Sequence, residues 1–370
     1  MTEKNRQETT ESGTGLKRGW TTGACATAAT RAALTALLTG RFPDPVTITL
    51  PRGQTPSFAL AREKMGPDEA MAAIVKDAGD DPDVTHGATI IATVRKGADR
   101  SGIVFRAGEG VGMVTLPGLP VEPGEPAINP VPRRMMTETV ETLSAEHDVR
   151  PDFEIEISIP GGQALAEQTW NPRLGIEGGL SVLGTTGIVN PFSCSAWIHS
   201  IHRGIDVARA AGLTHVLGST GSTSEKTAQE LYGLPDIACL DMGDFAGGVL
   251  KYLRAHPLPR LTIAGGFAKL SKLAQGALDL HSGRSQVDME WFAEKAGPDV
   301  NQSLRERILS ANTALEVLEL TRQAGIDLPA IVAEDARRTA LETLRGAPIE
   351  VDILVTDRKG NILARTAIDD

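Results

Sequence analysis

Beyond residue 193 the sequence alternates short apolar runs with helical segments. The runs 214–217, 237–240 and 261–264 have the length and composition of buried strands, and a helix is expected after each of them. Because two parallel strands need a crossover between them, this alternation predicts a parallel, doubly wound sheet. Residues 193–370 are therefore expected to form a βα-repeat, Rossmann-like domain whose ligands bind at the carboxyl ends of the strands. Its tail is expected to be helical and to end in a hairpin of the runs 350–355 and 361–365.

Residues 16–192 have a different pattern, which predicts an α+β domain. Thr21 and Thr22 precede an alanine-rich run that Gly40 follows, so a capped helix is expected there. A second helix is expected over 134–146, and residues 1–15 form a polar lead-in for which we expect disorder. Short strands bounded by Gly and Pro are expected at 46–50, 89–94, 103–106, 112–116 and 153–159.

Composition excludes several classes of protein. A chain of 370 residues exceeds one ordinary core and predicts two domains, and 41% hydrophobic with 23% charged residues is typical of a folded, soluble protein. The net charge of −10 disfavours nucleic acid and anionic membranes as partners. No segment reads as a signal peptide or a membrane span. The three cysteines are far apart, which argues against disulfides and structural zinc and fits the cytoplasm.

The expected carboxyl edge of the sheet carries residues suited to a nucleotide-like cofactor. A glycine-rich turn with Gly218 and Gly221 joins a strand to a helix, where free N–H groups and the helix dipole favour polar or anionic groups. Asp241 and Asp244 follow the next strand, where carboxylates accept hydrogen bonds from ribose, although helix capping is an equal alternative. Gly265 closes the third strand.

Basic side chains near the same edge suggest that anions bind there. Lys269 and Lys272 lie on adjacent helical turns and could bind carboxylate or phosphate, or simply form a solvated helix face. His281 is either a ligand or a helix cap. Arg133 and Arg173, together with Asn171, supply the forked donors that recognise carboxylates, although they could instead form structural ion pairs.

An acidic loop in the first half is the place where proton transfer could occur. Asp77, Asp80 and His86 lie in the segment 76–87, which lacks the ligand spacing of a calcium loop, so no metal is expected and acidic turns remain the alternative. The segment 108–112 predicts a tight turn at which backbone approaches something closely. Cys25 is either an activated thiolate or an inert buried thiol.

Five strings of the chain resemble the successive signatures of the CbiD family. They are TTGACATAA (21–29), KDAGDDPDVTHG (76–87), GEGVGMVT (108–115), AINPVPR (127–133) and NPRLGIEGGLSVLGTTGIVNPFS (171–193). That family comprises the cobalt-precorrin-5B C-methyltransferases of cobalamin biosynthesis. The resemblance implies two domains and methyl transfer from S-adenosylmethionine to carbon 1 of the macrocycle, giving cobalt-precorrin-6A. In the second half the chain departs from the family pattern at 219–222, 243–245 and 265–268, while Lys269, Lys272 and His281 match.

The resemblance and the chemistry together suggest roles for the candidate residues. The substrate is a polycarboxylate, so a local cluster of cations must receive it despite the acidic chain. Displacement at the sulfonium disperses charge, so alignment of the two reactants matters more than charge stabilisation. The residues expected to bind substrate are Thr22, Arg133, Asn171, Arg173, Thr185, Thr186, Lys269, Lys272 and His281. Those expected to bind the cofactor are Gly218, Gly221, Asp241, Asp244 and Gly265, and the candidate proton-transfer groups are Asp77, Asp80 and His86.

Two other functions are compatible with these residues. A nicotinamide-dependent tetrapyrrole reductase would use the same strand, loop and helix, although the glycine fingerprint is incomplete. A non-catalytic tetrapyrrole-binding protein would need the basic cluster without a cofactor pocket. Either kind of protein, like the methyltransferase, could be a homo-oligomer.

Overall fold

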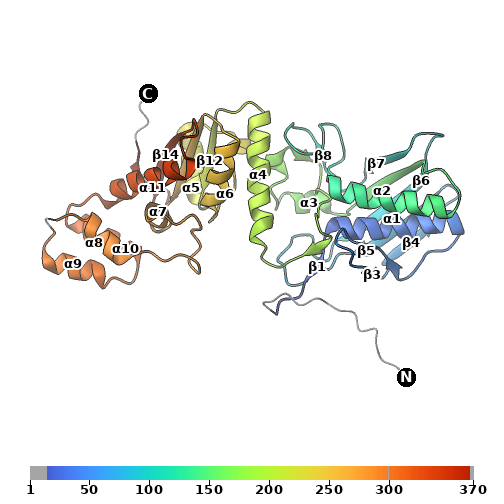
Figure 1. Ribbon diagram of the computed structural model, residues 1–370, viewed down its shortest axis with the longest axis horizontal. Helices are drawn as coiled ribbons and strands as arrows, with labels where there is room; N and C mark the ends of the chain where they lie inside the picture. Colours follow the sequence, from blue (N-terminus) through green and yellow to red (C-terminus); the bar gives the residue numbers. More distant parts are fainter. Residues whose placement is uncertain (1–14, 299, 367–370) are drawn as a thin grey trace, which may run out of the picture. The chain divides into compact units, whose positions relative to one another are not determined.

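The computed structural model describes residues 15–298 and 300–366, which fall into two compact units divided between Cys194 and Ser195 (Figure 1). Each unit combines helices with at least one sheet, so the chain is of mixed α/β class. The residues expected to form a lead-in lie outside the described part, apart from Gly15.

Within the described residues, the main sheet of the first unit has five strands in the order β4-β5-β6-β9-β7. Only β7 and β9 pair in parallel. Apolar residues of β5, β6 and β9 form one core with helices α1 and α2, because alternate side chains of a strand share a face. The bounds of these elements are α1 (Thr22–Thr39), β4 (Arg62–Met65), β5 (Glu69–Val75), β6 (Thr89–Lys96), β7 (Ile103–Ala107), α2 (Pro130–Glu146) and β9 (Phe153–Ser158).

Short elements surround this sheet. They include the antiparallel pairs β1 with β11, β2 with β3, and β8 with β10. Their bounds are β1 (Gly19–Trp20), β2 (Val46–Thr47), β3 (Ser57–Phe58), β8 (Met113–Val114), α3 (Gly162–Ala166), η1 (Pro172–Leu174), β10 (Ile176–Glu177) and β11 (Ile188–Val189).

The capped first helix is confirmed. The Thr21 hydroxyl accepts a hydrogen bond from the Ala24 N–H at 3.2 Å, and Gly40 ends the helix in the left-handed region, at φ 77°. The second helix begins earlier than predicted, at Pro130, because proline suits the first turn of a helix. The strands predicted at 89–94, 103–106 and 153–159 are observed as β6, β7 and β9. The strands predicted at 46–50 and 112–116 are shorter than expected, since β2 and β8 have only two residues each.

The second unit contains a sheet in the order β12-β13-β14-β15 among the described residues. The first three strands are parallel, and β15 is antiparallel to β14, which confirms the predicted terminal hairpin. Helix α5 contacts β12, β13 and β14, and its Ala228 lies in a small apolar cluster with Leu217, Ala264 and Leu354. Residues of α6, α7 and α11 lie in a separate, larger core, so helices cover both faces of this sheet.

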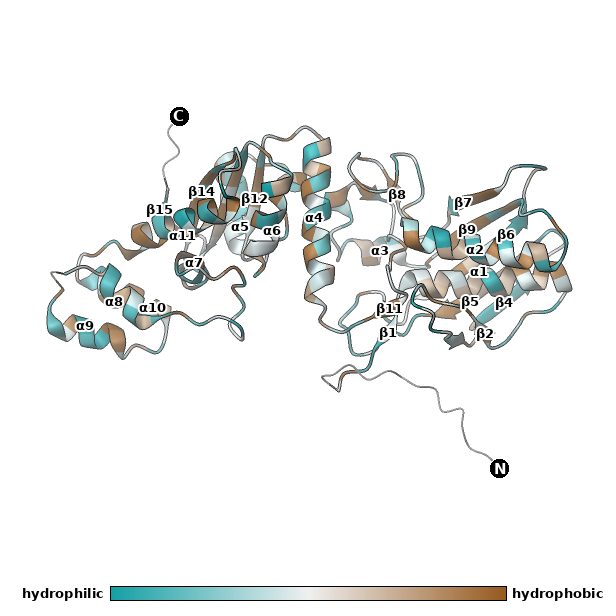
Figure 2. Cartoon of the chain, in the orientation of Figure 1, coloured by the Kyte–Doolittle hydropathy of each residue, from teal (hydrophilic) through white to brown (hydrophobic). Residues whose placement is uncertain are grey.

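The second unit contains amphipathic helices. In Figure 2, α9 and α10 alternate hydrophilic and hydrophobic colours along their length, as amphipathic helices do. The bounds are α4 (Cys194–Ala210), β12 (His215–Ser219), α5 (Ser222–Tyr232), η2 (Asp236–Ala238), α6 (Ala246–Ala255), β13 (Arg260–Gly266), α7 (Phe267–Ala274), α8 (Met289–Lys295), α9 (Gln302–Leu309), α10 (Ala314–Gln323), α11 (Leu328–Leu344), β14 (Glu350–Thr356) and β15 (Ile362–Arg365).

Two predictions for this unit were wrong in detail. The strand expected at 237–240 is the short helix η2 followed by a single parallel bridge between Cys239 and Leu217. The helix expected over 269–280 is α7, which ends before Gly276, where φ is 92°. The bridge still places Cys239 beside Leu217 of β12. Further along, the Gly243 N–H donates a hydrogen bond to the Ser219 carbonyl at 2.9 Å, so this segment lies alongside the end of β12.

The glycine turn at 108–112 does approach something closely, namely the protein's own backbone. A Cβ on Gly110 would lie 2.0 Å from the Ile159 carbonyl oxygen, and one on Gly179 would lie 2.3 Å from the carbonyl carbon of Gly110. The Leu180 N–H donates to the Gly110 carbonyl at 2.9 Å. These glycines therefore let two chain segments pack main chain against main chain.

We expect Gly110→Ala to lower the free energy of unfolding by about 3 kcal/mol or more, because it adds a steric clash to a positive φ of 73°. Gly53→Ala is the matched control, since φ there is 87° but nothing lies within 4 Å of the new Cβ. The control should cost only about 1 kcal/mol. Denaturant unfolding measures both variants, and equal losses would contradict the packing role of Gly110.

Candidate functional site

The carboxyl ends of β12 and β13 meet at one edge of the second sheet. The Thr220 N–H, just past β12, donates to the Ala264 carbonyl in β13 at 2.9 Å. Lys269 on α7 donates to the Thr220 carbonyl at 3.3 Å and forms an ion pair with Asp244 at 2.7 Å. The turn after β12, the loop before α6 and the helix after β13 are thus joined through one ammonium group.

The glycines of this edge have different roles. A Cβ on Gly265 would lie 2.7 Å from the Thr220 hydroxyl oxygen, and one on Gly218 would lie 3.0 Å from the Met242 sulfur, so both allow close packing within the protein. Gly221 is the N-cap of α5, and a Cβ there would meet nothing within 4 Å. The space beside Gly221 and the first turn of α5 therefore has room for a polar group of a ligand.

Asp241 lies in a strained part of the backbone. Its φ is 48°, which non-glycine residues seldom adopt, and its carbonyl accepts a hydrogen bond from the Trp197 indole at 2.8 Å. Gly243, two residues on, also has a positive φ, of 55°. The loop between Leu240 and Asp244 is thus held in a conformation that needs its surroundings.

Lys272 and His281 lie close to this edge. Lys272 is 8% exposed, and its ammonium donates to the Leu280 carbonyl at 2.9 Å. Burial lowers the pKa of Lys272. His281 is exposed, and its Nδ1 accepts a hydrogen bond from the Gly283 N–H at 3.1 Å. Helix α7 ends at Ala274, so His281 does not cap it.

The acidic loop of the first unit binds its own chain. Asp77 pairs with the Lys17 ammonium at 2.6 Å, and that hydrogen bond lowers the pKa of Asp77. Asp80 accepts the Lys17 backbone N–H at 2.7 Å, and His86 Nδ1 accepts the Ala78 N–H at 3.1 Å. The three candidate groups do lie together, but these contacts make Asp77 a weaker base and favour a structural role for the loop.

Lys76 is the residue of this loop whose importance the sequence did not suggest. It is 2% exposed and donates to the Asp83 carboxylate and the Thr85 hydroxyl. Burial by itself would raise the pKa of Asp83, but the charge and hydrogen bond of Lys76 lower it. A lysine at the end of a buried strand, followed by four carboxylates, is the signal that could have revealed this pair.

Most of the predicted substrate residues of the first unit serve the local fold. Asn171 is buried and donates to the Gly179 carbonyl at 3.2 Å, and Thr22 is only 3% exposed. The Thr186 hydroxyl bonds to the backbone of Ile188. Thr185 is exposed, and Arg173 lies in η1.

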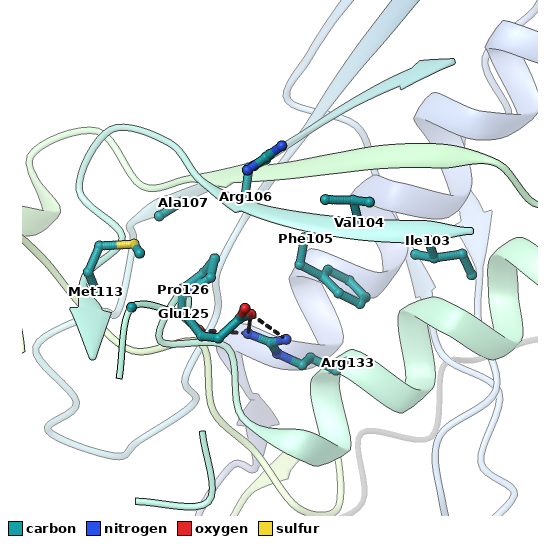
Figure 3. A pocket seen from close by; sticks show the side chains of 10 residues that line it. Ile103, Val104, Phe105, Arg106, Ala107, Met113, Glu125, Pro126 and Arg133 are labelled. Carbon is teal, nitrogen blue, oxygen red and sulfur yellow. Dashed lines mark hydrogen bonds and ion pairs between the residues drawn. The ribbon is translucent and has the colours of Figure 1, made fainter. Parts of the chain in front are cut away.

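Arg133 borders a cavity of about 450 Å³ (Figure 3). It donates to Glu125 at 3.1 Å through both terminal nitrogens, and to the carbonyls of Ile128 and Pro126. Its guanidinium also lies 5.4 Å from the Phe105 ring centroid. These bonds anchor α2 to the preceding loop, so a ligand carboxylate would have to share the guanidinium with Glu125.

Other chemistry considered from the sequence receives less support. Burial raises the pKa of Cys25 to about 12, so this thiol is inert rather than activated. Among the residues that the structure describes, no cluster of three or more His, Cys, Asp or Glu is arranged to hold a metal ion. No described helix is long and apolar enough to cross a membrane.

Comparison with known proteins identifies the family. The family model CbiD matches residues 9–191, and the model for the CbiD C-terminal domain matches residues 279–367. Proteins from Brucella canis and Brucella suis, both called cobalt-precorrin-5B C(1)-methyltransferase, are 70% identical to this chain over 353 residues, 95% of each chain. The chain belongs to the CbiD family.

A protein from Brucella melitensis, also called cobalt-precorrin-5B C(1)-methyltransferase, is 70% identical over 95% of both chains. A crystal structure of a cobalamin biosynthesis protein (cbiD) from Archaeoglobus fulgidus is 28% identical, with a TM-score of 0.40, and the match covers 73% of this chain and 83% of that one. The family-model matches and the 70% identical relatives confirm, at the level of the family, the resemblance read from the five strings.

The buried pair in the acidic loop leads to a stability prediction. Asp83→Asn leaves the Lys76 ammonium buried without its counter-charge, so the free energy of unfolding should fall by about 3 kcal/mol. The double variant Lys76→Met/Asp83→Asn removes both charges and should recover most of that loss. Urea unfolding of the three proteins measures these differences.

The same pair fixes the direction of a pH effect. The pKa of Asp83 is lower in the folded protein than in the unfolded chain. The stability that its ionised carboxylate contributes is therefore fully present above the unfolded pKa of about 4, and it is lost as the pH falls through the folded-state pKa. The double variant should lack this pH-dependent part of the free energy of unfolding. Wild-type stability for Asp83→Asn at neutral pH would contradict the role of the pair.

Proposed function

We propose that this CbiD-family chain is a cobalt-precorrin-5B C(1)-methyltransferase that uses S-adenosylmethionine. The observation that carries the proposal is 70% identity, over 95% of each chain, to relatives of that name. The relatives' names favour neither a nicotinamide-dependent reductase nor a non-catalytic carrier. When bound, S-adenosylmethionine supplies a methyl group whose bond to sulfur breaks, with the electron pair staying on sulfur, as ring carbon 1 forms the new bond.

We assign the donor to the carboxyl edge of the sheet in the second unit. The open space beside Gly221 suits an adenosyl group, and the carboxylates of Asp241 and Asp244 suit ribose or an ammonium group. The residues of this edge would bind and orient the donor, which is what an in-line displacement needs most. We also propose that this unit is a Rossmann-like domain, reduced to three parallel strands, and that the first unit is the substrate domain.

Substrate recognition is assigned to the first unit. The cavity in Figure 3 combines the apolar side chains of Ile103 and Phe105 with the guanidinium of Arg133, which a ligand would share with Glu125. Such a lining suits an acetate or propionate arm of a macrocycle. No proton-transfer role is assigned to Asp77, Asp80 or His86. The contacts described for these side chains join the acidic loop to the segment at Lys17 or stabilise the loop itself.

The remaining proposals concern the setting of the enzyme. None of the three cysteines, Cys25, Cys194 and Cys239, forms a disulfide, and this fits a reducing cytoplasm. The acidic chain disfavours nucleic acid as a partner. A homo-oligomeric state remains a prediction from the sequence.

Incubation of the purified protein with cobalt-precorrin-5B and methyl-labelled S-adenosylmethionine tests the function directly. The label should pass to the corrinoid, and one S-adenosylhomocysteine should form for each methyl transferred. Oxidation of reduced nicotinamide without methyl transfer would support a reductase instead. Tight corrinoid binding with no turnover would support a carrier.

Asp241→Asn tests the donor assignment. Asparagine tolerates the positive φ of 48°, so the fold should be kept while the carboxylate is lost. S-adenosylhomocysteine affinity should fall by about 1–3 kcal/mol, measured by titration calorimetry, with little change in melting temperature. An unchanged affinity would move the donor away from this edge.

A further inference from the structure

Lys272 is a buried ammonium group with too few partners. It lies on the second turn of α7 and is more than nine-tenths buried. Among the described residues its ammonium makes one hydrogen bond, to the Leu280 carbonyl at 2.9 Å. Two of its N–H groups are therefore available, and a buried cation without further partners is costly unless a ligand supplies them.

The groups around Lys272 belong to the proposed donor edge. The Leu280 N–H donates to the Asp244 carbonyl at 2.8 Å, so one residue links Lys272 to the loop before α6. Asp244 in turn pairs with Lys269, which bonds to the Thr220 carbonyl. Lys272 is thus connected through four contacts to the turn that follows β12.

Lys272 forms no ion pair among the described residues. Lys269 pairs with Asp244, and Arg284 pairs with Asp279 at 2.9 Å, whereas the acceptor described for the Lys272 ammonium is the neutral Leu280 carbonyl. A ligand carboxylate would supply a counter-charge and accept hydrogen bonds from the open N–H groups of Lys272.

We propose that Lys272 binds the α-carboxylate of the methyl donor's methionine moiety, beside Asp244, which receives the α-ammonium. This assignment rests on the proposed function and gives Lys269 and Lys272 to the donor, where the sequence had assigned them to the macrocycle. An amino acid end carries both charges on one carbon. A macrocycle carboxylate has no adjacent ammonium and would have no use for Asp244.

The geometry of Asp244 favours the zwitterion over a simple anion. Lys269 holds its Oδ1, and no described residue donates a hydrogen bond to its Oδ2. An ammonium group can fill that position while the carboxylate reaches Lys272. The cluster therefore offers an acceptor and a donor side by side, as recognition of an amino acid requires.

Two ligands that differ only in the amino acid end test this inference. S-adenosylhomocysteine has that end, whereas methylthioadenosine lacks it and keeps the adenosine and the sulfur. Lys272→Met keeps the apolar stem and removes the charge, so the variant should fold. Lys226→Met, on the exposed side of α5, is the matched control. Titration calorimetry gives both affinities for wild type and the two variants.

Lys272→Met should weaken S-adenosylhomocysteine binding at least tenfold and leave methylthioadenosine binding unchanged within about twofold. The control should change neither. Equal losses for both ligands, or no loss for either, would overturn the proposal. A rise in the corrinoid KM with unchanged S-adenosylhomocysteine affinity would return Lys272 to the substrate. If wild type binds neither ligand, the proposed donor itself is wrong.

Discussion

Parallel hydrogen bonding of β13 to β12 on one side and β14 on the other is the constraint on which the second unit depends. Parallel strands all end at one edge, so the turns after them converge there although they are far apart in sequence. The backbone groups of those turns cannot all be satisfied by the sheet. The Lys269 ammonium meets part of this need, because it binds the Thr220 carbonyl and the Asp244 carboxylate together.

The first unit is held by a different device, the close approach of main chain to main chain. Gly110 and Gly179 permit it, and the acidic loop adds bonds from Asp77 and Asp80 to the segment at Lys17. Several strings that carry the family resemblance are therefore explained by packing. A motif can be specific for a family and still act mainly through the fold.

The sequence predicted elements whose local signals agree with their packing. Helix α1 has a hydroxyl cap, strong helix formers and a closing glycine, and β12 with α5 has an apolar run followed by a glycine turn. The hairpin of β4 and β5 was missed. Alanine and methionine occupy four of the seven positions of β5, and these residues favour helices, so its strand conformation depends on pairing with β6 and packing under α1.

The candidate site was only partly predictable for a related reason. Glycines and aspartates at the sheet edge follow from the strand order, which can be read from the alternation of elements. The partners of a lysine cannot be read in this way. Lys272 was expected on a solvated or ligand-facing surface, but the chain after α7 folds back so that Leu280 covers it, and Lys76 is buried by similar tertiary contacts.

The central claim is that the methyl donor lies at the carboxyl edge of the second sheet. Ultraviolet photolabelling with radiolabelled S-adenosylmethionine, followed by peptide mapping, tests this claim directly. The label should be found on peptides that contain residues 218–222, 241–245 or 265–272, and excess S-adenosylhomocysteine should abolish it. Competable label confined to the glycine turns at 108–112 or 183–187 of the first unit would contradict the account.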